Sequence, residues 1–280
     1  MVSCSTNHEP PPMTAIEDIP FREIDGHTLN ARLYRPDAPN GTWLIDVHGG
    51  AWGSGDRLNN AVIHEDLAAN GVGVFALDFR LSDAARYPVP VQDVSFGIRW
   101  FKANTRDLGI ETAHIGGLGS SSGAQQLGLV ALRPDDPAWT VADPDLGGID
   151  SDIEFFVAGW PIFDPLRRYR MVRDAGNDRL VAAHDAYFPT EADMDTGNPY
   201  RLLERGDATH LPPILIVQGT DDANVDHTWQ DDFAELYRSN GGACEVRKFD
   251  GMPHTFVTAD PEAPASKDAI TAIRDFVLGV

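Results

Sequence analysis

A serine flanked by glycines lies near the middle of the chain, at Ser121. The stretch Gly119-Ser120-Ser121-Ser122-Gly123 reads as G-x-S-x-G, and only Ser121 has glycine two places before and two places after it. This pattern is typical of a sharp strand-to-helix turn that exposes one hydroxyl above a sheet. The flanking positions favour glycine because it has no Cβ to clash in a crowded turn. Taken alone, the pattern describes a plain glycine-rich loop equally well, so its chemistry depends on partners elsewhere.

A serine hydroxyl is a poor nucleophile at neutral pH and needs an adjacent base. Histidine suits this task because its unperturbed pKa is about 6.5, and a buried carboxylate must then hold the imidazole in the correct tautomer. His254 lies in a glycine- and proline-containing loop late in the chain, and Asp221 and Asp222 follow an apolar run. Loops at the carboxyl ends of parallel strands meet at one edge of a sheet. We therefore expect Ser121, His254 and one of these two aspartates to lie together.

A glycine pair follows another apolar run, in His48-Gly49-Gly50-Ala51-Trp52. Glycines placed after a buried strand let backbone N–H groups point into a cavity, where they can stabilise a developing oxyanion. An ordinary glycine-rich turn is the alternative interpretation of this segment.

Strand and helix patterns alternate along the chain. This alternation predicts an α/β fold in which a mostly parallel central sheet carries helices on both faces. A hairpin is expected over 21–34, with strands over 43–47, 73–79, 113–118, 155–159, 213–218 and 244–249, and helices over 59–70, 91–102, 124–132, 229–239 and 265–278.

The domain organisation is expected to be simple. Residues 1–19 are polar and proline-rich and predict a flexible N-terminal tail, and 20–280 predict a single domain. Residues 161–210 lack a strand pattern and contain several aromatic residues, so we expect a small helical cap inserted over the carboxyl edge of the sheet.

Charge and composition exclude several classes of function. The chain has 280 residues with 22 basic and 43 acidic side chains, and its formal charge of -21 disfavours nucleic acid and anionic lipid as partners. Cys4 and Cys244 do not make a disulfide framework, and no apolar run is long enough to span a membrane. The first residues lack the pattern of a secretory signal. A cytoplasmic enzyme is expected, and the sequence leaves open whether it forms a homodimer.

Five segments in order resemble the esterase/lipase branch of the α/β-hydrolase fold, near its hormone-sensitive-lipase-like and feruloyl-esterase/kynurenine-formamidase-like groups. They are His48 to Trp52, Asp78-Phe79-Arg80-Leu81 with Tyr87-Pro88 and Asp93, the Ser121 turn, Gly219-Thr220-Asp221-Asp222 with Val225, and His254-Thr255-Phe256. The resemblance implies that Ser121 is the nucleophile, His254 the general base and acid, and Asp222, rather than Asp221, the orienting acid. It implies an oxyanion hole made by the N–H groups of Gly50, Ala51 and Ser122.

The chain departs from the family pattern in three places. Ala51 stands where the lipase-like group usually has a third glycine, so the N–H is kept while the acyl pocket is narrowed. Gln218 stands where many relatives have histidine, and we assign it no catalytic weight. The N-terminal segment is too short for a two-helix cap.

Several other histidines and aromatic residues are not expected to react. His48 is expected to brace the oxyanion loop, while His64, His184 and His227 are expected on helix surfaces. No paired metal-ligand spacing is present, so neither a metal nor a cofactor is expected. Trp52, Trp160 and Phe188 are the candidate pocket walls.

The leading hypothesis is a serine carboxylesterase that hydrolyses small to medium carboxylic esters through an acyl-enzyme. An arylformamidase, or a feruloyl or acetyl-xylan esterase, would use the same three residues. A hydrolase fold used only for binding is a different class, although such proteins usually lack one of the three residues that this chain has.

Overall fold

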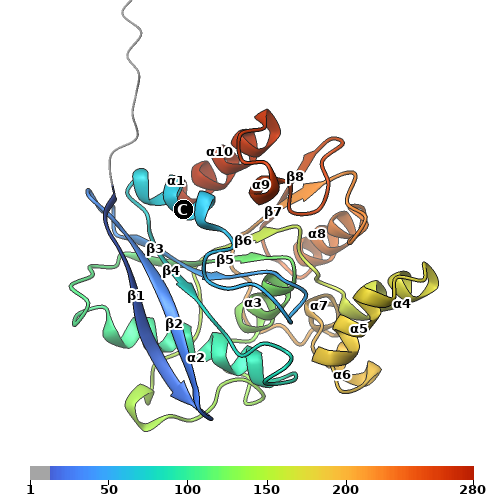
Figure 1. Ribbon diagram of the computed structural model, residues 1–280, viewed down its shortest axis with the longest axis horizontal. Coiled ribbons are helices and arrows are strands. Elements are labelled where there is room, and N and C mark those ends of the chain that lie inside the picture. The colour runs from blue at the N-terminus through green and yellow to red at the C-terminus, as the bar shows by residue number, and fades with distance from the viewer. Residues whose placement is uncertain (1–12) are drawn as a thin grey trace, which may run out of the picture.

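The computed structural model describes residues 13–280 (Figure 1). The flexible tail expected over 1–19 falls partly outside this range. Residues 13–19 do not form a tail, because strand β1 begins at Met13 and runs to Ile24. β1 pairs antiparallel with β2 (His27–Pro36), with Asp25-Gly26 at the turn between them. The exposed start of β1 is held partly by cross-strand ion pairs, such as Arg32 Nε to Asp18 Oδ1 at 2.8 Å.

One eight-stranded sheet runs through the molecule in the order β1-β2-β4-β3-β5-β6-β7-β8. β1, β2 and β4 pair antiparallel, and all other neighbours pair parallel, so the mostly parallel sheet predicted from the sequence is confirmed. The remaining strands are β3 (Thr42–Val47), β4 (Gly73–Leu77), β5 (His114–Ser120), β6 (Phe156–Gly159), β7 (Ile214–Gly219) and β8 (Cys244–Phe249).

Alternate residues of the central strands pack into two separate apolar cores. In β3, Ile45 and Val47 join one core, whereas Leu44 joins the other. Successive side chains of a strand point to opposite faces, so a run that is apolar throughout is expected where both faces are covered. This is why the central strands read as continuous apolar runs in the sequence.

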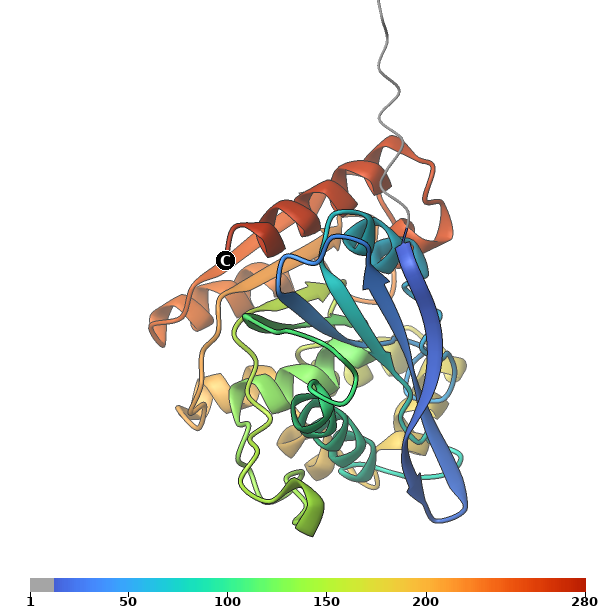
Figure 2. The ribbon, with the colours of Figure 1, turned by 90° about the vertical axis from the view of Figure 1, so that its left-hand side faces the viewer.

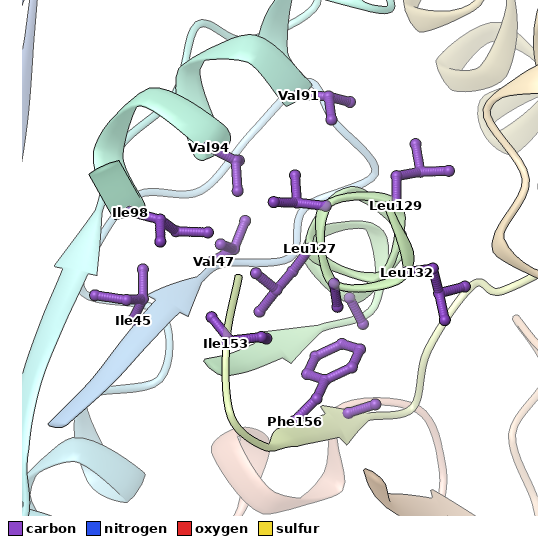
Figure 3. Packing of buried hydrophobic residues seen from close by; sticks show 14 of the residues in the cluster. Ile45, Val47, Val91, Val94, Ile98, Leu127, Leu129, Leu132, Ile153 and Phe156 are labelled. Carbon is purple, nitrogen blue, oxygen red and sulfur yellow. The ribbon is translucent and has the colours of Figure 1, made fainter. Parts of the chain in front are cut away.

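Helices cover both faces of the sheet. α1 (Ala61–Ala69), α9 (Phe256–Ala259) and α10 (Pro264–Leu278) pack on one face, and α2 (Val89–Asn104), α3 (Ser122–Leu132) and α8 (Trp229–Ser239) pack on the other. Figure 2 shows α10 and the pair α2 and α3 on opposite sides of the strands. In the core beneath α2, the side chains of Val94 and Ile98 meet those of Val47 and of Leu127 from α3 (Figure 3).

Four short helices lie between β6 and β7, within the segment where a cap is expected. They are α4 (Pro165–Asp174), α5 (Asp178–Tyr187), α6 (Glu191–Thr196) and α7 (Pro199–Arg205). Each begins with an Asp, Asn or Thr side chain that accepts a hydrogen bond from a backbone N–H of the first turn, which explains why such short helices form. None of the helices in residues 13–280 is long and apolar enough to cross a membrane.

Cys244 provides a test of the packing at the edge strand β8. Burial raises the pKa of the Cys244 thiol to about 12. Because the thiolate is the reactive form, a rise of this size lowers thiol reactivity near neutral pH on the order of 10³-fold. We expect Cys244 in a Cys4→Ser variant to react with Ellman's reagent at least 10²-fold more slowly in buffer than in 6 M urea at the same pH. Equal rates in the two solutions would contradict the burial of this thiol.

Candidate active site

Ser121 occupies the turn between β5 and α3. Its backbone has φ 51° and ψ −116°, a conformation that L-residues rarely adopt, and it places the side chain above the end of the sheet. The flanking glycines are required by close backbone contacts. A Cβ on Gly123 would lie 2.1 Å from the carbonyl oxygen of Val47, and one on Gly119 would lie 2.8 Å from Ala124 Cα. The two glycines of the G-x-S-x-G pattern are therefore needed because α3 packs closely on β3 and β5.

A substitution at Gly123 tests this packing. In Gly123→Ala, the new methyl group must push α3 away from β3, because backbone atoms cannot move aside as a flexible side chain can. We expect a loss of about 1–3 kcal/mol in the free energy of unfolding. Urea denaturation measures the change, and Gly147→Ala, whose Cβ would meet nothing closer than 3.7 Å, is the matched control. Equal midpoints for the two variants would contradict the contact.

Three side chains from separate loops meet at the carboxyl end of the sheet. Ser121 Oγ lies 2.9 Å from His254 Nε2, and His254 Nδ1 lies 2.7 Å from Asp222 Oδ2. The contact with a carboxylate assigns the proton to Nδ1, which leaves the lone pair of Nε2 facing the hydroxyl. The structure therefore brings together the three residues that the sequence selects, in the arrangement that a base-activated serine needs.

The Asp222 carboxylate is buried and fully hydrogen-bonded. Oδ1 accepts from the N–H groups of Asn224 and Val225 at 2.8 and 3.0 Å, and Oδ2 accepts from Gln218 Nε2 at 2.8 Å in addition to His254. Burial alone would raise the pKa of Asp222. The hydrogen bond and charge of His254, together with the hydrogen bonds from Gln218 and the Val225 N–H, outweigh burial and hold the pKa below its usual value. The group is therefore ionised at neutral pH. Asp221 is exposed and its carboxylate makes no hydrogen bond or ion pair in the part of the chain described.

Three backbone N–H groups near Ser121 are free to bind an oxyanion. Those of Gly50, Ala51 and Ser122 donate to no protein acceptor in residues 13–280, and Gly50 and Ala51 line the cavity that contains Ser121. Gly50 has φ +123°, and a Cβ there would lie 1.9 Å from the carbonyl oxygen of Ser54. Ala51 adopts φ 50° without being glycine.

Buried polar contacts hold this loop in place. The Gly49 N–H donates to Ser120 Oγ at 3.0 Å. Asn60 Nδ2 donates to Ser120 Oγ at 3.1 Å and to Asp46 Oδ1 at 2.9 Å. His48 donates from Nδ1 to the Gly49 carbonyl at 2.7 Å and stacks on a neighbouring ring, as expected for a brace.

The cavity beside Ser121 has a volume of about 300 Å³ and mostly polar walls. Trp160 lines it, with the Trp160 ring edge-on to His254. Trp52 and Phe188 do not line it, so two of the three predicted pocket walls are corrected. Trp52 has φ 62°, which turns its ring away from the cavity and onto Tyr187, while Phe188 packs edge-on to both rings.

Three histidines and one glutamine also differ from the sequence-based predictions. His64 and His184 are fully buried rather than on helix surfaces, His64 beside Asp46 and His184 on the inner side of α5 beside Arg168 of α4. His227 is not on a helix but in the turn before α8. Gln218, to which no catalytic weight is assigned, is a direct hydrogen-bond donor to Asp222. A polar residue inside an otherwise apolar strand, four positions before the acid, is the one signal that indicates this contact.

Comparisons with known proteins place these features in a family. The model of a family described as alpha/beta hydrolase fold matches residues 44–258. Ethyl acetate hydrolase of Pseudomonas putida is 33% identical over 253 residues, which cover 86% of this chain and 76% of that protein. Versiconal hemiacetal acetate esterase of Dothistroma septosporum is 24% identical over 280 residues, covering 92% of this chain and 79% of that protein.

Solved structures share the same fold. Esterase 2 of Thermogutta terrifontis with propionate bound aligns with a TM-score of 0.77 at 23% identity over 96% of each chain. The same esterase phosphorylated by paraoxon aligns with a TM-score of 0.77 at 22% identity, again over 96% of each chain.

Proposed function

Because this chain belongs to the alpha/beta hydrolase fold family and is a carboxylic ester hydrolase, we propose that it cleaves esters of short carboxylic acids at Ser121 through an acyl-enzyme. The observation that carries the proposal is the unbroken line of hydrogen bonds from Ser121 Oγ through His254 to the buried Asp222 carboxylate. Two other features support it, the free N–H groups of the neighbouring loop and the cavity that they share with Ser121.

The first half of the reaction forms the acyl-enzyme. His254 Nε2 takes the proton of the Ser121 hydroxyl while Oγ bonds to the acyl carbon of the ester. The carbonyl oxygen becomes an oxyanion, and the N–H groups of Gly50, Ala51 and Ser122 donate to it. Asp222 stabilises the imidazolium without taking its proton. The C–O bond to the alcohol then breaks, and His254 gives its proton to the leaving oxygen.

The second half returns the enzyme to its starting state. Water gives a proton to His254 Nε2 and bonds to the acyl carbon, so an oxyanion forms again in the same place. The bond between the acyl carbon and Oγ breaks, the acid leaves, and His254 returns the proton to Ser121. Both halves need the same imidazole in the same tautomer, which the contact with Asp222 maintains.

The size and polarity of the cavity support short acyl groups. A volume of about 300 Å³ with few apolar walls offers little surface on which a long acyl chain could be buried. The relative from P. putida is named for ethyl acetate, and the esterase of T. terrifontis is described with propionate and with butyrate bound.

A series of p-nitrophenyl esters from acetate to decanoate tests this proposal. We expect kcat/KM to be highest between two and four acyl carbons and to fall at least 10-fold by eight. N-formylkynurenine and methyl ferulate, assayed beside the series, represent the arylformamidase and feruloyl esterase alternatives. Faster turnover of either compound than of p-nitrophenyl acetate, or a maximum at long acyl chains, would contradict the proposed substrate class.

A further inference from the structure

The cavity beside Ser121 contains a buried positive charge that the proposed reaction does not use. Arg168, on α4 of the cap, is 2% exposed, and it lines the same cavity as Ser121 and His254. Arginine is rarely buried without a carboxylate to pair with, since removal of a charge from water costs several kcal/mol.

The contacts of the guanidinium leave one side of it unsatisfied. Nε donates to the carbonyl oxygen of Asn224 at 3.1 Å, and Nη1 donates to His184 Nε2 at 3.5 Å. His184 Nδ1 donates to the Leu180 carbonyl at 2.8 Å, so Nε2 is the unprotonated acceptor and the ring is neutral. Burial, and then the charge of Arg168, lower the pKa of His184 to about 3, which agrees with this assignment. Nη2 has no hydrogen-bond partner within residues 13–280.

No acid of the described chain lies within ion-pairing distance of the Arg168 guanidinium. The charge of Asp222 acts on the guanidinium, but the two oxygens of Asp222 are already occupied by His254, Gln218 and backbone N–H groups. Burial lowers the pKa of Arg168, to about 10, with the charge of Asp222 opposing this change. Arg168 therefore remains a cation at neutral pH.

A second arginine strengthens the positive charge of this wall. Arg179, at the start of α5, lines the same cavity and also makes no ion pair within the described residues. α4 and α5 lie against each other in the cap (Figure 1). A chain with a formal charge of -21 thus places two unpaired cations in the wall of its reactive cavity. Such a wall attracts an anionic group locally although the molecule as a whole repels one.

We propose that the natural substrate is an ester that also carries a carboxylate, which Arg168 binds through Nη2 while the ester carbonyl lies at Ser121. This inference rests on the proposed role of Ser121. The carboxylate can belong to the acyl part, as in a half-ester of a dicarboxylic acid, or to the alcohol part. In either case it replaces the missing acid partner of Arg168 and offsets the cost of burying the guanidinium. Charge-assisted hydrogen bonds of this kind are about twice as strong as neutral ones.

Two matched pairs of esters test the proposal. Monoethyl succinate and ethyl butyrate differ by a carboxylate in place of the terminal methyl group of the acyl part. 4-Acetoxybenzoate and phenyl acetate differ by a carboxylate on the alcohol part. We expect the anionic member of at least one pair to have the higher kcat/KM, and the pair that shows this preference identifies the part that Arg168 recognises. A preference for the neutral ester in both pairs, or no preference, would overturn the inference.

Variants at Arg168 separate recognition from a structural role. In Arg168→Gln, the ratio of kcat/KM for the anionic ester to that for the neutral ester should fall about 10- to 100-fold. In Arg168→Lys, which retains the positive charge, the ratio should be largely restored. Arg170→Gln, on the exposed side of the same helix, should leave the ratio unchanged. An arginine that only anchors the cap would lower both rates and keep their ratio, and that result would refute the proposal.

A Ser121 variant distinguishes a failure of the proposed function from a failure of this inference. Ser121→Ala should abolish hydrolysis of all four esters. Hydrolysis that depends on Ser121 but shows no preference for the anionic esters would overturn the inference and leave the role of Ser121 intact.

Discussion

Replacement of Ser121 by alanine is expected to lower kcat for p-nitrophenyl acetate by about 10⁴- to 10⁶-fold. Within residues 13–280, no other hydroxyl is hydrogen-bonded to His254 Nε2 and could replace that of Ser121. The side chain is buried at the mouth of the cavity, and its hydroxyl has no hydrogen-bond partner other than His254 in that range. The fold should therefore be unaffected, with a melting temperature within about 2 °C of wild type. Initial rates and thermal unfolding measure the two quantities.

A serine elsewhere in the chain controls for the substitution itself. Ser239 lies exposed at the end of α8, where its hydroxyl donates only to the Leu236 carbonyl. Ser239→Ala should retain wild-type kcat. Wild-type turnover in Ser121→Ala would refute the assignment of the nucleophile.

Asp222→Asn is expected to lower kcat by about 10³- to 10⁴-fold. The single amide oxygen can accept either from His254 and Gln218 or from the N–H groups of Asn224 and Val225, and the amide NH2 would then face donors on the other side. It also supplies no charge to stabilise the imidazolium. Asp221→Asn is the matched control, since this exposed carboxylate makes no contact that the reaction needs, and it should change kcat less than 3-fold. The reverse pattern would move the acid to Asp221.

The fold was predictable because its central strands are buried on both faces. β3, β4 and β7 are buried throughout, and each reads as a short apolar run. The first half of β1 was not predictable in this way. Its residues from Ala15 to Asp18 are exposed at the sheet edge, where the strand is held by backbone pairing and ion pairs such as Glu17 to Arg35. Edge strands of this kind leave no apolar pattern to recognise.

The three reacting side chains were predictable because each follows a strand whose carboxyl end reaches the same edge of the sheet. The pocket walls were not, because the direction of a side chain in a loop depends on its backbone. Trp52 turns inward at a positive φ that no feature of its neighbours indicates. Arg168 on α4 contacts His184 on α5. This contact depends on how the two cap helices pack against each other, which the sequence alone does not specify.

Covalent labelling tests the central claim most directly. A fluorophosphonate reacts with a serine only when a base removes the proton from its hydroxyl, so the reagent reports whether His254 activates Ser121. We predict one adduct per chain by intact mass, located at Ser121 by peptide mapping, and at least 10³-fold slower labelling in His254→Ala. An adduct on a different serine, or equally fast labelling without His254, would contradict the account.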